Sequence, residues 1–172
     1  MLSEKDTIVA CSSPPGRGAI SIIRLSGNKA FSNIQKITKN KLKKQISLVK
    51  FPLNDGLIEK CVLTIFKSPN SYTGEDVVEI STHGNPHIVE EVIKKCLNSG
   101  AKIAKPGEFT LRAYLNNKLS LDQSEAVIDI INANSKASLK AAQNSLEGGL
   151  KLKISAIQDR LRETRVLVET LI

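Results

Sequence analysis

The chain has 172 residues, of which 41% are hydrophobic and 24% charged, a composition typical of globular proteins and not of disordered or collagen-like ones. Its apolar runs reach about four residues, far short of the roughly 20 needed to span a bilayer. The N-terminus lacks the apolar core of a signal peptide, so we expect a cytoplasmic protein. Three cysteines without CxxC spacing and two histidines argue against a disulfide framework or a metal site.

The net charge of +8 is unevenly distributed along the chain. Residues 1–118 hold 18 Lys and Arg against 10 Asp and Glu, whereas residues 119–172 hold seven of each. The run Lys36–Lys50 contains six lysines and no acidic residue. This run predicts either a solvated helix end and loop, or a surface that faces an anion such as RNA.

Short runs rich in Val and Ile, broken by Gly and Pro, dominate the first two-thirds of the chain and predict β-strands. Two stretches with apolar residues three and four positions apart predict helices between them. This order predicts an α+β domain, a mixed sheet with helices packed on one face. The expected strands are Thr7–Cys11, Ala19–Leu25, Cys61–Phe66, Val77–Ser81 and Ala101–Ala104, and the expected helices are Ala30–Thr38 and a segment around Ile88–Leu97 that ends at Ser99 and Gly100.

The pattern becomes helical after Lys118, and we therefore divide the chain into domains 1–118 and 119–172. Asp122 is expected to cap a helix over Gln123–Asn134, with Glu125 at capping-box spacing. A second helix is expected over Ser138–Glu147, and Gly148 and Gly149 then predict a kink or a close packing contact. Apolar residues continue at helical spacing to the end of the chain. We therefore expect that the chain is a fragment, or that its helices form a bundle with a segment that is absent from it.

Arg24 and Glu79 are charged residues within otherwise apolar strands. Strand alternation places Arg24 on the same face as Ile20 and Ile22. A charged side chain among apolar strand residues needs an opposite charge or a ligand. The two residues therefore predict an ion pair with each other, a solvent-facing position for one of them, or a small-molecule site.

Two further segments leave alternatives open. The loop Ser12–Gly18, with two prolines and two glycines, predicts either a tight connection or an anion-facing loop. His83 follows a strand and is more typical of a structural hydrogen bond than of catalysis. The sequence lacks a P-loop lysine motif, and Phe66 is the clearest strand aromatic in a chain with 3% aromatic residues, which argues against base stacking on the sheet.

Three blocks of sequence, taken together and in order, resemble one family. The blocks are Asp6–Ala10 with Pro14–Gly18 and Ile23–Gly27; Ser71–Asp76 with His83 and Gly84; and Lys105–Thr110 with Arg112–Asn116 and Lys118–Ala126. Through these blocks the chain resembles the MnmE (TrmE) family of tRNA-modification GTPases over its whole length.

The resemblance implies an N-terminal folate-binding-like α/β domain that forms a homodimer and binds 5-formyltetrahydrofolate or a related tetrahydrofolate. It implies that a helical domain follows, into which a GTPase domain is inserted. With the FAD protein MnmG (GidA), the complete family protein adds an aminomethyl or carboxymethylaminomethyl group at C5 of the tRNA wobble uridine. This chain stops before the GTPase domain, so we expect it to bind no GTP, Mg²⁺ or K⁺ and to hydrolyse no GTP by itself.

The resemblance also implies the folate contacts, which fall on Arg24, Glu79 and Lys118. A carboxylate such as Glu79 suits the two parallel N–H donors of a pterin, and Arg24 or Lys118 suits the anionic glutamyl tail. These roles make an Arg24–Glu79 ion pair the less favoured alternative. No residue is expected to be catalytic. The competing functions are a basic tRNA-binding module, with Lys41, Lys43 and Lys44 as contacts, and a purely structural dimerisation module.

Overall fold

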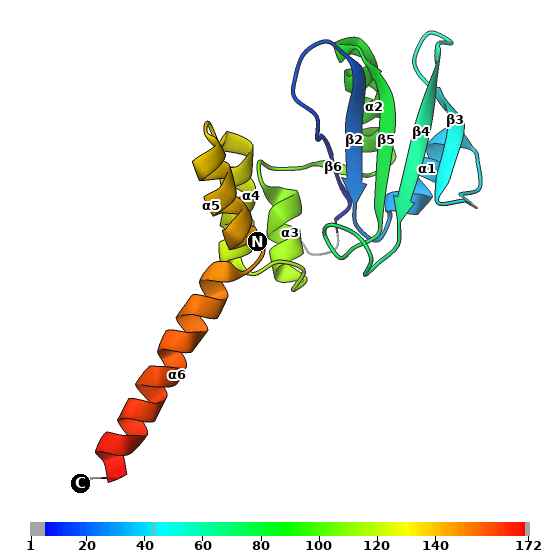
Figure 1. Ribbon diagram of the computed structural model, residues 1–172. Coiled ribbons are helices and arrows are strands. Elements are labelled where there is room, and N and C mark those ends of the chain that lie inside the picture. The colour runs from blue at the N-terminus through cyan, green and yellow to red at the C-terminus, as the bar shows by residue number, and fades with distance from the viewer. Residues whose placement is uncertain (1–5, 43, 171–172) are drawn as a thin grey trace. The chain divides into compact units, whose positions relative to one another are not determined.

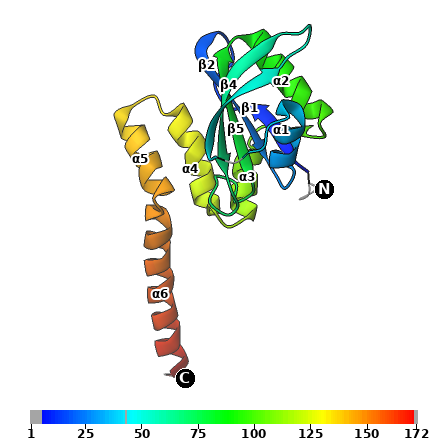
Figure 2. The same ribbon diagram turned by 90° about the vertical axis from the view of Figure 1, so that its right-hand side faces the viewer.

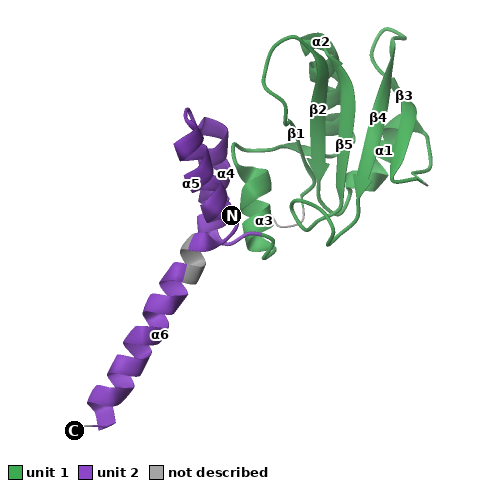
Figure 3. Ribbon diagram, viewed as in Figure 1, with its two compact units in different colours: residues 1–118 green, residues 119–172 purple. Residues whose placement is uncertain are grey.

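The computed structural model describes residues 6–42 and 44–170, apart from the side chains of residues 150–152. The chain divides into two compact units, residues 1–118 and residues 119–172 (Figure 3). The first unit carries all the described strands and three helices, and the second unit is helical. In chain order the elements are β1 (Ile8–Cys11), β2 (Gly18–Ser26), α1 (Ala30–Thr38), β3 (Ile46–Pro52), β4 (Ile58–Phe66), β5 (Val77–Gly84), α2 (Pro86–Asn98), β6 (Lys102–Ile103), α3 (Glu108–Leu115), α4 (Leu121–Asn132), α5 (Lys136–Leu146) and α6 (Gly149–Thr170).

One mixed sheet forms the centre of the first unit, with the strand order β3-β4-β5-β2-β1-β6 (Figure 1). All neighbouring strands are antiparallel except β1 and β6, which are parallel. The β3–β4 hairpin turns at Asp55 and Gly56, and both residues have positive φ angles, 52° and 74°, as a type I′ turn requires. The predicted α+β class with a mixed sheet is confirmed.

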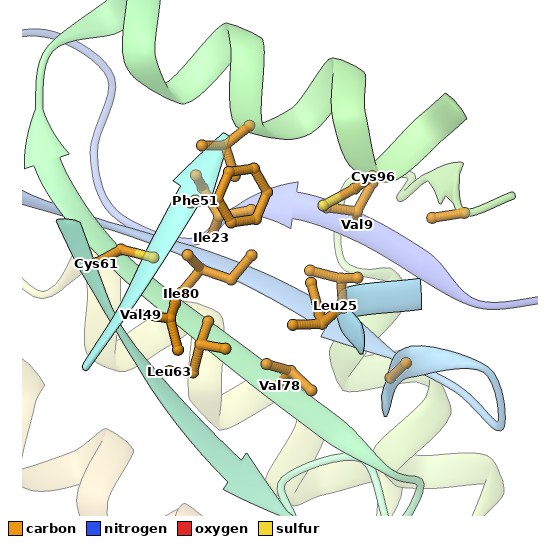
Figure 4. Close-up of a cluster of buried hydrophobic side chains, with 14 residues drawn as sticks. Val9, Ile23, Leu25, Val49, Phe51, Cys61, Leu63, Val78, Ile80 and Cys96 are labelled. Atoms are coloured by element: carbon orange, nitrogen blue, oxygen red, sulfur yellow. The ribbon is translucent and has the colours of Figure 1, made fainter. Parts of the chain in front are cut away.

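Helices α1 and α2 cover one face of the sheet (Figure 2). Alternate strand residues point into the core between sheet and helices, among them the fully buried Phe51, Leu63 and Ile80 (Figure 4). Ile34 of α1 and Val92 of α2 complete this core from the helical side. Burial of such apolar side chains is the main stabilising contribution to the unit.

The face of the sheet away from α1 and α2, here called the outer face, is partly open to solvent. In β2, the core residues Ile23 and Leu25 are buried, whereas Ile20, Ile22 and Arg24 on the outer face are exposed or half-buried. This is the alternation expected for Arg24. The side chain of Arg24 is thus held in an apolar wall without being sealed in the core.

Two elements of the first unit depart from the sequence prediction. The end of the lysine-rich run overlaps β3, which the sequence prediction left unassigned; its Phe51 is a second strand aromatic besides Phe66 and is fully buried. The helix α3 was also not predicted. Its buried residues are Glu108, Arg112 and Ala113, so an ion pair occupies the inner face where an apolar stripe would have revealed the helix.

The helices of the second unit begin and end close to the predicted positions. The cap of α4 is Ser120, two residues before the predicted cap Asp122, because Ser120 and Gln123 form the reciprocal capping box. Asp122 instead accepts a hydrogen bond from the Ser120 hydroxyl. Gly148, with a φ of 82°, separates α5 from α6, so the glycine pair interrupts the helical stretch.

We expect only Cys11 to react with a thiol reagent in the folded protein. Cys61 and Cys96 are core residues, and burial raises the pKa of each thiol to about 12, with the Glu59 carboxylate adding to the effect at Cys61. Because the thiolate is the reactive form, both stay unreactive even at pH 10. Mass spectrometry after labelling should show one adduct in buffer, three in denaturant, and none for folded Cys11→Ser. A second rapid adduct in buffer would contradict this burial.

Candidate functional site

Arg24 and Glu79 lie directly opposite each other on β2 and β5. The Arg24 Nη2 lies 2.7 Å from Glu79 Oε1, and Arg24 Nε donates to the same oxygen at 2.9 Å. The ion pair that the family resemblance made the less favoured alternative is therefore present. Its physical reason is the register, because directly paired residues on antiparallel strands bring their side chains together on one face.

The ion pair leaves part of the Glu79 carboxylate available. Both guanidinium contacts go to Oε1, and within the described residues no hydrogen bond reaches Oε2. The two side chains keep 23% and 22% of their surface exposed. The pair is thus partly desolvated, so its hydrogen bonds are stronger than those of a surface pair, and it remains accessible from the outer face.

Two aromatic rings flank the Arg24 guanidinium. Its central carbon lies 5.2 Å from the centre of the Tyr72 ring and 5.5 Å from that of the Phe109 ring. Both distances fall within the range of cation–π attraction. The rings come from separate elements, the β4–β5 loop and α3, so this position joins three parts of the first unit.

The β4–β5 loop, residues 67–76, is fastened to α3 by polar contacts. The Tyr72 hydroxyl lies 2.9 Å from the Thr110 hydroxyl. The Asn116 amide donates to the Thr73 carbonyl at 2.7 Å. These contacts hold the β4–β5 loop and α3 together, and the two segments form one wall, or side, of the site around the Arg24–Glu79 pair.

A buried charge network supports the same wall. Arg112 lies 3.1 Å from both Glu75 and Glu108 and donates to the Asp6 carbonyl oxygen at 2.7 Å. The Arg112 and Glu108 side chains are only 10% and 7% exposed. Ser26 donates to the Glu75 carboxylate at 2.6 Å, which ties the network to the end of β2.

Lys118, the third predicted folate contact, lies at the end of the α3 segment and is exposed. Its stem passes Gly74, where an added Cβ would lie 3.2 Å from the Lys118 Cγ. Gly74 has a φ of +76°, so both backbone conformation and this close approach favour glycine there. The structure therefore brings Arg24 and Glu79 into contact and places Lys118 against the loop that supplies Tyr72. Among the described residues, Lys118 forms no ion pair.

His83 makes the structural kind of contact expected for it. Its Nδ1 lies 2.7 Å from Glu59 Oε1, and its backbone N–H donates to the same oxygen at 2.9 Å.

The loop Ser12–Gly18 lines, with α2, a mainly apolar cavity of about 550 Å³ whose wall includes Cys11, Val89 and Ile93. Among its described lining residues, this cavity includes neither Arg24 nor Glu79, and neither of the two rings beside them.

Tyr72 and Phe109 are the functional candidates that reasoning from single residues missed. Each lies within a sequence block that carried the family resemblance, Ser71–Asp76 and Lys105–Thr110. The signal that could have identified them was the presence of an aromatic residue in each of two short glycine-containing segments, Ser71–Asp76 and Lys105–Thr110. The two rings lie near each other only because both pack beside Arg24 in the folded chain, and no local sequence pattern predicts that proximity.

The described residues contain no helix that is both long and apolar enough to cross a membrane. Nor do they contain a cluster of three or more His, Cys, Asp or Glu side chains arranged to hold a metal ion.

Comparison with known proteins identifies relatives along nearly the whole chain. It is 50% identical over 166 residues to the tRNA modification GTPase MnmE of Francisella tularensis subsp. holarctica (strain OSU18), covering 96% of this chain and 37% of that protein. The protein of the same name from Francisella tularensis subsp. novicida (strain U112) is 49% identical with the same coverage. That from Francisella philomiragia is 48% identical, again over 96% of this chain and 37% of the relative.

The chain thus spans just over a third of the length of these relatives. The family model described as the N-terminus of the GTP-binding protein TrmE matches residues 7–118, a range that contains Arg24, Glu79, Tyr72 and Phe109. The matched range ends at the last residue of the first compact unit. This chain therefore belongs to the MnmE (TrmE) family and contains its N-terminal domain.

Proposed function

We propose that this chain is the tetrahydrofolate-binding, homodimerising N-terminal region of a GTPase that modifies C5 of the tRNA wobble uridine together with MnmG. The observation that carries the proposal is the partly exposed Arg24–Glu79 pair between Tyr72 and Phe109. Polar groups that converge in an apolar and aromatic wall are the usual composition of a small-molecule site.

The Glu79 carboxylate fits the pterin end of a folate. Its Oε2 is free of hydrogen bonds within the described residues, and each carboxylate oxygen has more than one acceptor position. Oε2 can therefore accept a pterin N–H while Arg24, which makes both of its contacts to Oε1, stays in place. Arg24 then fixes the orientation of the carboxylate beside the ligand.

The remaining groups fit the rest of the ligand. Tyr72 and Phe109 offer ring faces and edges to the flat pterin and aminobenzoyl rings. Lys118, exposed beside Gly74, offers a positive charge for the glutamyl carboxylates. When bound, a tetrahydrofolate would supply the one-carbon unit, and the residues of this chain would bind it and orient it.

The outer face of the sheet supports the dimer part of the proposal. Large apolar side chains that are exposed there include Ile46 at 63% and Leu48 at 73%, two positions apart on β3. Exposed apolar residues in one sheet face are typical of protein–protein contacts. The names of the relatives, tRNA modification GTPase MnmE, support the role of the complete protein in tRNA modification.

Calorimetric titration of this chain with 5-formyltetrahydrofolate tests the proposal directly. We expect saturable binding near one ligand per chain, at protein concentrations where light scattering shows a dimer. A folded dimer that releases no heat and retains no ligand in equilibrium dialysis would refute the folate site and leave the purely structural dimerisation module. A folded chain that stays monomeric at all concentrations would refute the homodimer.

A further inference from the structure

A second, chemically distinct cavity lies where β3 begins and β4 ends. It has a volume of about 340 Å³, and its lining includes Lys44, Gln45, Phe66, Lys67 and Asn70. The cavity is held in place by the strand pairing, since the Ile65 N–H donates to the Gln45 carbonyl at 2.8 Å. Within the described residues, it shares no lining residue with the Arg24–Glu79 site.

The two lysines of this cavity lack acidic partners. Among the described residues, neither Lys44 nor Lys67 takes part in an ion pair. The two acids that end the β4–β5 loop are occupied elsewhere, because Glu75 binds Arg112 and Asp76 accepts from the Ser68 N–H at 3.0 Å. Two lysines that line one cavity, with no Asp or Glu among its described lining residues, favour an anion there.

Further lysines precede the cavity residues in the sequence. Lys36, Lys39 and Lys41, on α1 and after it, are all exposed and form no ion pair within the part of the chain that the structure describes. Lys43, which the sequence also suggested as a contact, lies outside the described residues. The described lysines of the run Lys36–Lys50 thus have the exposure required for either of its two predicted roles.

We infer that the cavity between Lys44 and Lys67 binds a phosphodiester of an RNA strand together with its adjoining nucleoside. The ammonium groups neutralise the phosphate. The side-chain amides of Gln45 and Asn70, which make no hydrogen bonds among the described residues, supply donors and acceptors for a base edge. Phe66 provides one apolar wall, which fits contact with a single nucleoside and agrees with the low aromatic content of the chain.

An RNA partner fits these observations better than an anionic membrane. A membrane surface selects lysines around a protruding apolar face, whereas here the lysines line a concave site with two unpaired amides. The inference rests on the proposed function only in its choice of RNA. Its site is separate from the folate site, so the two can fail independently.

The test measures binding of a synthetic anticodon stem–loop RNA with an unmodified wobble uridine to the 172-residue chain over a series of salt concentrations. In the double variant Lys44→Gln/Lys67→Gln we expect affinity to fall about tenfold or more at low salt. The slope of log K against log salt should fall by about 0.7 to 0.9, the contribution of the single phosphate that the two lysines share. The variant Asn70→Ala should weaken binding without changing the slope.

The matched control is Lys136→Gln/Lys140→Gln, which removes two exposed charges from α5 in the charge-balanced second unit. We expect its affinity and slope to stay near the original values. Equal losses in both double variants would mean a diffuse charge effect and would overturn the site. Tight binding of a duplex DNA of equal charge, or binding of phosphatidylserine vesicles without RNA binding, would overturn the assignment to RNA.

Folate titration of the same variants separates this inference from the proposed function. Unchanged folate binding shows that the variants are folded. Folate binding without RNA binding would reject the RNA site alone. RNA binding that depends on Lys44 and Lys67, in a chain without folate affinity, would support the RNA site and reject the folate site.

Discussion

Arg112→Ala is expected to lower the free energy of unfolding of the first unit by about 3–5 kcal/mol, the usual effect of removing one partner from a buried ion pair. Arg112 holds two carboxylates, Glu75 and Glu108, at 3.1 Å each, and its own exposure is 10%. Without the guanidinium, two largely buried carboxylates remain near each other without a counter-charge. The Asp6 carbonyl oxygen also loses a donor.

Urea unfolding followed by circular dichroism measures this effect, and Lys102→Ala is the matched control in the same unit. Lys102 pairs with Asp6 at 2.7 Å, but its side chain is 67% exposed, so its loss should change stability by about 0–1 kcal/mol. Similar shifts for the two variants would show that Arg112 is not a buried anchor. Arg112→Met, which fills the space without charge, should be at least as destabilising as Lys102→Ala because both acids stay unpaired.

The second large effect is expected at Glu79. In Glu79→Gln, 5-formyltetrahydrofolate should bind about ten- to hundredfold more weakly, which corresponds to about 1.5–3 kcal/mol for a charge-assisted hydrogen bond. Glutamine keeps the size of the side chain but replaces one acceptor oxygen with an N–H₂ donor. That donor would face the donors of the pterin or the Arg24 guanidinium, and both arrangements are unfavourable.

Isothermal calorimetry is the measurement, and Glu90→Gln is the control. Glu90 lies on α2, where its hydrogen bond to Lys94 lowers the pKa of the carboxyl, and it does not border the Arg24–Glu79 pair. We expect Glu90→Gln to bind folate as the original chain does. If folded Glu79→Gln also binds folate with unchanged affinity, Glu79 is not a ligand contact. If Tyr72→Ala loses folate affinity while Glu79→Gln retains it, the folate contacts the aromatic rings and not the Glu79 carboxylate.

The core strands could be predicted because their apolar residues are continuous in the sequence. Runs such as Ile20–Leu25 and Val77–Ile80 carry β-branched residues on both faces, and the helix Ala30–Thr38 was predicted with its observed bounds. The strand β3 was missed because its outer face carries Lys50 within a lysine-rich segment. Only Val49 and Phe51 of its residues are buried, and two alternating residues make a weak signal.

The candidate site was harder to predict because its parts meet only in the tertiary structure. Arg24 and Glu79 each stood out as charges in apolar strands, but their pairing depends on the register between β2 and β5. In α3, Glu108 and Arg112 face inward, so the helix has a charged buried side that apolar periodicity cannot detect. Tyr72 and Phe109 approach Arg24 only because that helix and the β4–β5 loop are fastened together.

The parallel pairing of β1 with β6 has a consequence for biosynthesis. Ile8 of β1 pairs with Lys102 of β6. During translation, β1 therefore cannot pair with β6 until nearly the whole first unit has left the ribosome. The β1–β2 and β3–β4 antiparallel pairs join nearby segments and can form early, whereas contacts between distant segments form late. Nascent chains that end before Lys102 are therefore expected to expose one edge of β1, and chaperone capture during translation should be strongest in that interval.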